Sequence, residues 1–163
     1  MLHLHYLLKL CRFLKGYFQM KKDVLLAIDQ GTTGSKALLL NSNGIILSSH
    51  TVEFQQIFPQ NDYVEHQTED IWNSVTEAIK TSILKAKIDP ANIKCIGITN
   101  QRETTVLWDK KTGQSLHNAI VWQCKRTIPL CKKLKAEGYE DLFRQKTGLL
   151  LDPYFSGTKM KWL

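Results

Sequence analysis

The chain contains 163 residues, of which 43% are hydrophobic and 23% are charged. This composition is typical of a globular protein and argues against a disordered, collagen-like or membrane-spanning chain. A chain of this length buries about two thirds of the surface that its unfolded form exposes, so it can build a core without disulfides or metals.

The net charge of +7 is concentrated near the N-terminus. The basic residues that precede the first acidic residue, Asp23, are Lys9, Arg12, Lys15, Lys21 and Lys22. Only +2 therefore remains for residues 23–163, where lysines and arginines are dispersed. A nucleic-acid interface needs basic residues clustered on one face, so we expect no nucleic-acid partner.

The cysteines form no Cys-x-x-Cys pair and have no histidine at zinc spacing; they are Cys11, Cys95, Cys124 and Cys131. Reduced thiols in a cytoplasmic protein are the simplest interpretation. Residues 1–19 are apolar and basic, but their apolar runs are too short for a signal-peptide core or a membrane span. We interpret residues 1–19 as an extension outside the fold, with the natural start at Met20; an amphipathic surface helix is the alternative.

Three strands are predicted at the start of the remaining chain. Residues 24–28 form a continuous apolar run, which is typical of a strand covered on both faces. Residues 37–40 are apolar again, Asn43-Gly44 is a strong hairpin signal, and residues 45–52 continue as a third strand. We expect the three strands to form an antiparallel meander.

Helices and further strands follow. Apolar residues recur at helical spacing after Thr68, and Asp89-Pro90 ends that helix. Further strands are predicted at residues 95–98, 105–108 and 119–122, and helices at residues 127–136 and 139–145. A last helix follows Tyr154, with Ser156 or Thr158 as its cap. This order predicts an α/β fold with a mixed sheet.

The first strand ends in a turn that suits a phosphate group. The turn reads Asp29-Gln30-Gly31-Thr32-Thr33-Gly34-Ser35-Lys36. Its glycines let backbone N–H groups approach closely, its threonines offer hydroxyl donors and Lys36 offers a cation. Asp29 can bind Mg²⁺ or its waters. The glycine spacing differs from that of a Walker loop, and a plain glycine-rich hairpin turn is the alternative.

Polar side chains also follow two of the later strands. The segment Thr99-Asn100-Gln101-Arg102-Glu103-Thr104 comes after a buried strand, where open α/β sheets bind ligands. The adjacent Arg102 and Glu103 offer donors and acceptors together, which suits a polyhydroxyl ligand. Trp122 could wall such a ligand. A surface ion pair and ordinary core packing are the respective alternatives.

These motifs together resemble the N-terminal part of the glycerol kinases, members of the FGGY carbohydrate kinase family. The resemblance runs from about Met20 to Leu163. The segments that carry it are residues 29–33, 57–60, 64–66, 97–105, 118–123 and 152–159. It implies a ribonuclease-H-like fold of the actin and hexokinase superfamily, of which residues 20–163 would be part of the N-terminal domain. It also implies ATP-dependent transfer of phosphate to a terminal hydroxyl of glycerol, with Mg²⁺.

The resemblance assigns roles to particular residues. Those that match the glycerol-contacting positions are Arg102, Glu103, Trp122 and Tyr154. Those that match the phosphate-facing turn are Asp29, Thr32, Thr33 and Lys36, with Asp29 also as the metal ligand. Gly34 and Lys36 stand where many relatives have Ser and Arg, and a lysine offers phosphate a single-point contact instead of a planar fork.

The resemblance also places the general base and most of the adenine pocket beyond Leu163. We therefore expect the chain alone to be inactive and assign it no catalytic residue. The apolar residues Met160, Trp162 and Leu163 are expected to need a docking surface elsewhere. The alternatives are another FGGY kinase acting on a different polyol, such as xylulose or gluconate, and a non-catalytic fragment. A homo-oligomer of the full-length enzyme remains open.

Overall fold

The structure is a computed structural model that describes residues 23–163. The predicted extension at residues 1–19 and the predicted start at Met20 lie outside the described residues. The described chain forms two compact units. We call residues 23–54 and 69–100 the sheet unit, and residues 55–68 and 101–163 the loop unit. Each is described by itself below.

The sheet unit contains a four-stranded mixed sheet with the order β3-β2-β1-β5. Its strands are β1 (Val24–Gln30), β2 (Gly34–Asn41), β3 (Ile46–Glu53) and β5 (Ile93–Asn100). The pairs β1–β2 and β2–β3 are antiparallel, whereas β1 and β5 are parallel. The turn between β2 and β3 contains Gly44 at a φ of 78°. The predicted meander and the predicted mixed sheet are both confirmed.

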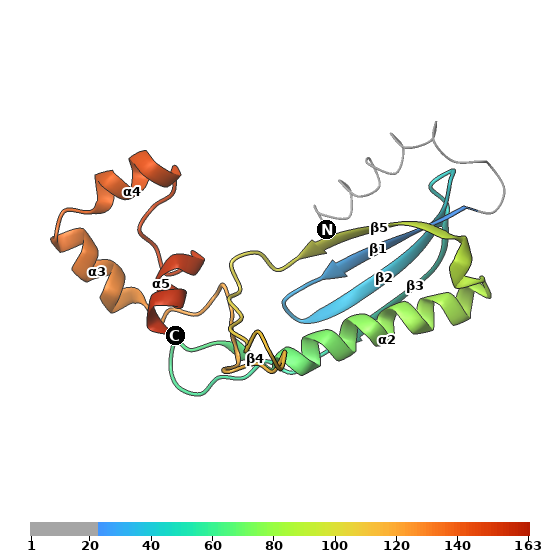
Figure 1. Cartoon of the computed structure of the whole chain (residues 1–163), viewed down its shortest axis with the longest axis horizontal. Helices are drawn as coiled ribbons and strands as arrows, with labels where there is room; N and C mark the ends of the chain where they lie inside the picture. Colours follow the sequence, from blue (N-terminus) through green and yellow to red (C-terminus); the bar gives the residue numbers. More distant parts are fainter. Residues whose placement is uncertain (1–22) are drawn as a thin grey trace. The chain divides into compact units, whose positions relative to one another are not determined.

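Helix α2 (Thr68–Ala86) covers one face of this sheet, as Figure 1 shows. The residues of α2 that are buried are small: Ser74, Ala78 and Ser82. The Oγ atoms of Ser74 and Ser35 are 2.7 Å apart, and Ser82 Oγ donates to the Ala37 carbonyl at 3.1 Å. Small side chains let the helix approach β2 closely, and their hydroxyls leave no polar group unpaired at the contact.

Strand β1 is apolar on both faces, as its sequence predicts. Val24, Leu26 and Ile28 pack toward α2, together with Ala37 and Leu39 of β2. The opposite face of the sheet carries a second buried cluster, which consists of Leu25, Ala27, Leu38 and Leu40 with Cys95 against it. A 3₁₀ turn at Pro90–Asn92 leads into β5, and Asp89 caps it by accepting a hydrogen bond from the Ala91 N–H.

The loop unit has little regular structure. It contains two two-residue strands, β4 (Glu65–His66) and β6 (Ala119–Ile120), which pair antiparallel. Three helices follow, α3 (Ile128–Ala136), α4 (Glu140–Thr147) and α5 (Ser156–Trp162). No helix within residues 23–163 is both long enough and apolar enough to cross a bilayer.

Of the two strands predicted in the loop unit, the one at residues 105–108 does not form and the one at residues 119–122 is shorter than predicted. Residues 105–108 form only isolated bridges, from Thr105 to Ile120 and from Trp108 to Ser115. Val106, Leu107 and Trp108 are exposed, so no sheet face buries this apolar run. The predicted strand at residues 119–122 ends at Ile120, because the Trp122 N–H turns away to the Thr104 hydroxyl at 3.2 Å.

A buried ion pair holds the two segments of the loop unit together. Arg126 donates from Nη2 to Glu65 Oε1 at 2.5 Å, and Asn118 donates to Glu65 Oε2 at 2.9 Å. The Arg126 guanidinium lies 4.1 Å from the Tyr63 ring centroid and 4.5 Å from that of Trp162. Trp162 makes these contacts within the loop unit but stays 43% exposed, and Met160 is 61% exposed, so both keep apolar surface that a docking surface elsewhere would cover, as expected.

The contact between α2 and the sheet should not tolerate a larger side chain at its centre. We expect Ala78→Leu to lower the free energy of unfolding by about 1–3 kcal/mol, because extra methylenes in a packed core force backbone shifts. Ala78 is 1% exposed. Urea unfolding followed by circular dichroism measures this effect. Lys80→Leu, at an exposed position of the same helix, is the control and should change stability by less than about 0.5 kcal/mol.

The Glu65–Arg126 pair should make stability depend on pH. Burial raises the pKa of Glu65, but hydrogen bonds from Arg126 and Asn118 and the Arg126 charge outweigh burial, so the pKa lies below its ordinary value of 4.5. The stabilisation is therefore complete above the ordinary pKa and is lost as pH falls through the lowered one. We expect Glu65→Gln to cost about 3 kcal/mol at neutral pH, because it leaves a buried guanidinium unpaired.

Urea unfolding at pH values from neutral to acidic tests this expectation. The stability gap between the wild type and Glu65→Gln should shrink as the pH falls below the ordinary pKa of Glu65. Glu137→Gln is the control, since Glu137 forms an exposed pair with Lys133 at 3.9 Å that should contribute less than about 1 kcal/mol. A gap that stays constant over this pH range would contradict the assignment.

Candidate active site

The predicted phosphate-facing turn connects β1 and β2 of the sheet unit. Asp29 and Lys36 are directly opposite each other in the β1–β2 register, and Thr32 and Thr33 lie in the turn between them. The Gly31 N–H donates to the Gly34 carbonyl at 2.9 Å, which closes the turn. Thr33 is exposed, while Asp29, Thr32 and Lys36 are half-buried. The turn thus places one carboxylate, two hydroxyls and one ammonium close together at the surface of the sheet unit.

The glycine at position 34 of this turn is explained by the close approach of the β3 backbone. A Cβ on Gly34 would lie 2.7 Å from the Val52 carbonyl oxygen of β3. The Phe54 N–H also donates to the Thr33 carbonyl at 3.3 Å, so the end of β3 stays against the turn. A serine in place of Gly34 would therefore need β3 to move at this point.

The turn between β1 and β2 suits a metal ion that is bound mainly by the phosphate groups of a nucleotide better than one that is bound by protein side chains alone. No group of three or more His, Cys, Asp or Glu side chains within residues 23–163 could hold a metal ion. Mg²⁺ in nucleotide sites is usually held by one or two carboxylates, by phosphate oxygens and by waters. Asp29 alone meets that smaller requirement.

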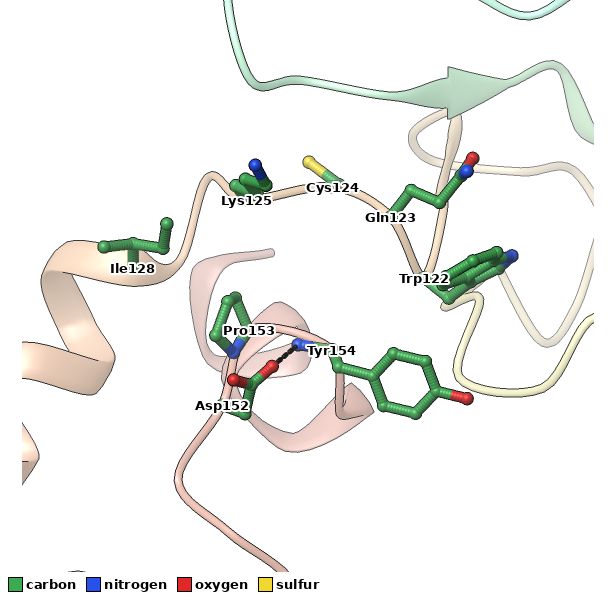
Figure 2. A pocket seen from close by; sticks show the side chains of 8 residues that line it. All are labelled: Trp122, Gln123, Cys124, Lys125, Ile128, Asp152, Pro153 and Tyr154. Atoms are coloured by element: carbon green, nitrogen blue, oxygen red, sulfur yellow. Dashed lines mark hydrogen bonds between the residues drawn. The ribbon is translucent and has the colours of Figure 1, made fainter.

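A pocket of about 390 Å³ lies within the loop unit, and Figure 2 shows its lining. Its volume falls in the range of small-molecule sites, about 300–1,000 Å³. One wall is the segment after β6 and the other is the segment before α5. The residues that line it are Trp122, Gln123, Cys124, Lys125, Ile128, Asp152, Pro153 and Tyr154.

Two of the predicted polyol-contacting residues meet in this pocket. The rings of Trp122 and Tyr154 are 5.8 Å apart between centroids at an interplanar angle of 68°, an edge-to-face contact. Both side chains are half-buried, so part of each ring faces solvent. The other two predicted residues, Arg102 and Glu103, belong to the same unit but do not line this pocket.

Glu103 is tied to the segment that carries Tyr154. Its Oε2 accepts hydrogen bonds from the Ser156 N–H at 2.9 Å and from the Ser156 hydroxyl at 2.8 Å. The prediction that Ser156 or Thr158 caps this helix is therefore wrong, because the cap of α5 comes from Glu103 and the Thr158 hydroxyl pairs with that of Thr127 at 2.9 Å. Distant residues supply this cap, and local sequence does not reveal it.

Glu103 also has a strained backbone. Its φ is 66°, in the left-handed region, which costs a non-glycine residue about 1–3 kcal/mol. Such strain persists only where the surroundings impose it, and it often occurs at functional positions. Oε1 makes no hydrogen bond within the described part of the chain, so it is available to a ligand hydroxyl.

A chain of hydrogen bonds fixes the backbone of Trp122. Its N–H donates to Thr104 Oγ1, and the Thr104 hydroxyl donates to Gln101 Oε1 at 3.1 Å. Gln101 Nε2 in turn lies 3.3 Å from His66 Nδ1. Gln101, Thr104 and His66 were not among the predicted site residues, because hydroxyl and amide side chains carry no distinguishing signal in a single sequence.

Comparison with known proteins agrees with these observations. Residues 24–163 match the N-terminal domain of the FGGY family of carbohydrate kinases. The chain is 53% identical over 139 residues to a glycerol kinase from Geobacillus sp., covering 85% of this chain and 28% of that protein. It is 56% identical over 139 residues to one from Chelativorans sp., with the same shares covered.

A solved structure shows the same fold. The crystal structure of Plasmodium falciparum glycerol kinase with ADP superposes with a TM-score of 0.81 and 34% identity, over 90% of this chain and 29% of that one. The chain thus spans less than a third of the length of these relatives. The match over residues 24–163 shows that the chain belongs to the FGGY family of carbohydrate kinases.

Proposed function

We propose that this chain supplies the polyol-binding residues and the phosphate-facing turn of an ATP-dependent kinase whose acceptor is a terminal hydroxyl of glycerol. The observation that supports it most is the pocket walled by Trp122 and Tyr154, with Glu103 tied to the same segment. The relatives named glycerol kinase favour glycerol over other polyols. We assign no catalytic base among residues 23–163.

Each polyol-contacting residue has a task that suits its chemistry. The Trp122 ring would pack on the carbon backbone of glycerol, since aromatic faces favour C–H groups over water. The Tyr154 phenol would exchange one hydrogen bond with a hydroxyl, and Glu103 Oε1 would accept another. The exposed Arg102 would donate to a hydroxyl oxygen. Together these contacts would orient one hydroxyl for transfer, because phosphoryl transfer depends mainly on positioning and charge stabilisation.

The turn between β1 and β2 would hold the phosphate groups. Thr32 and Thr33 would donate hydroxyls, Lys36 would supply one positive charge and Asp29 would hold Mg²⁺ directly or through water. ATP supplies the transferred phosphoryl group, and Mg²⁺ neutralises charge on its oxygens.

The polyol pocket can be tested by glycerol binding to the full chain. We expect Trp122→Leu and Tyr154→Phe each to weaken binding by about 2- to 10-fold, since each removes one aromatic contact or one hydrogen bond. Saturation-transfer NMR with glycerol, competed by xylulose and by gluconate, measures these affinities. The controls are Trp108→Leu and Tyr139→Phe, at exposed positions of the same unit outside the pocket.

Two outcomes would contradict the proposal. Equal losses in the pocket variants and in the controls would show that polyols do not use this pocket. Tighter binding of xylulose or gluconate than of glycerol would show that the acceptor is a different polyol, as in other kinases of the same family.

The role of Lys36 can be tested by binding of Mg·ATP. We expect Lys36→Ala to weaken binding about fivefold and to reduce its dependence on salt, because one phosphate contact is lost. Lys36→Arg should bind at least as well as the wild type, since the guanidinium offers a planar fork. Titration followed by phosphorus NMR measures the affinity. Lys80→Ala, on the exposed side of α2, is the control; an equal loss there would contradict the assignment.

A further inference from the structure

Lys159 is the largest fully buried side chain in the described part of the chain. It lies on α5 with no exposed surface. A lysine is almost never buried completely unless its ammonium group has partners. Lys161, two residues along the same helix and so on its opposite side, is exposed. The burial of Lys159 therefore calls for a specific set of contacts.

The partners of Lys159 are three consecutive backbone carbonyls. Nζ donates to the carbonyl oxygens of Pro153 at 2.8 Å, of Tyr154, and of Phe155 at 3.3 Å. An ammonium group has three protons and no acceptor, so these three bonds use all of its donors. The backbone that precedes α5 is thus folded around a single cation.

This backbone carries a wall of the pocket. The Tyr154 carbonyl accepts the hydrogen bond from Lys159, and the Tyr154 N–H donates to Asp152 Oδ1 at 2.8 Å, so both of its backbone polar groups are held. The segment ends at Ser156, which Glu103 holds. With the backbone fixed on both sides, few directions remain for the Tyr154 ring, and it stands against Trp122.

The surrounding charges keep the ammonium group in place. Burial lowers the pKa of Lys159, and the carboxylates of Glu103 and Asp152 act against that lowering. A neutral side chain of similar length could fill the same space but could not hold three carbonyls. Replacing Lys159 with such a side chain therefore removes the three hydrogen bonds while keeping the packing.

We propose that Lys159 is a positioning residue of the polyol pocket, which sets the place of the Tyr154 ring through the carbonyls of residues 153–155. The link to polyol binding rests on the proposed function, whereas the link to the ring position does not. Lys159 itself does not line the pocket.

Fluorine NMR of the full chain labelled with 3-fluorotyrosine tests the proposal. Tyr154→Phe and Tyr63→Phe assign the two resonances that matter. In Lys159→Met, we expect the Tyr154 resonance to move toward its position in the urea-unfolded chain. The Tyr63 resonance, which reports the packing on Arg126, should stay in place. Lys161→Met is the matched control on the same helix and should move neither resonance.

Glycerol binding to the same variants tests the functional link. We expect Lys159→Met to weaken binding about tenfold, comparable to losing the Tyr154 contact, and Lys161→Met to leave it unchanged. If wild-type chain binds no glycerol but Lys159→Met still moves the Tyr154 resonance, the proposed function fails and the positioning role stands. If glycerol binds and the resonance does not move, only the positioning role is overturned.

A second variant covers the case in which Lys159→Met does not fold. Lys159→Gln keeps an amide donor and should move the Tyr154 resonance part of the way while Tyr63 stays in place. If both variants lose the Tyr63 and Tyr154 resonances together, Lys159 supports the whole unit and not the ring, and the proposal is overturned.

Discussion

The loop unit depends on buried and half-buried charged side chains whose partners lie far away in the sequence. Arg126 reaches Glu65 across 61 residues, and Glu103 reaches Ser156 across 53. A unit with two short strands and three short helices has few ladder hydrogen bonds to define it. The charged groups instead fix how its segments pack. An ammonium or guanidinium group that is removed from water needs several acceptors in fixed directions, so it determines where those acceptors lie.

The sheet unit is held in a different way. Its central strands β1 and β2 bury apolar side chains on both faces, and α2 covers one face with small residues that allow a close approach. The polar turn between β1 and β2 is short and grows out of that rigid pair of strands. Groups placed on such a scaffold keep their positions without buried ions, which is why many ligand sites occur where strands end.

The sheet unit and the three helices of the loop unit could be predicted from the sequence, whereas the contacts of the loop unit's irregular segments could not. The apolar run of β1, the Asn43-Gly44 turn and the helical spacing of α2 are local patterns, and each element formed as predicted. The run at residues 105–108 has the same local appearance, but Val106, Leu107 and Trp108 are exposed, because burial depends on which other segments pack there. The pairing of Trp122 with Tyr154 lies between these cases: the family resemblance selects both residues, but their contact depends on the fold.

The separation of Glu65 from Arg126 has a consequence for how the protein is made. Ribosomes add about 5–20 residues per second, so the 61 residues from Glu65 to Arg126 take about 3–12 s to synthesise. During that interval β4 has no β6 to pair with, whereas the three antiparallel strands of the sheet unit have already been synthesised. Residues 55–68 therefore reach their folded contacts only after Arg126 has been added, so this segment folds after its own synthesis and together with the later part of the chain.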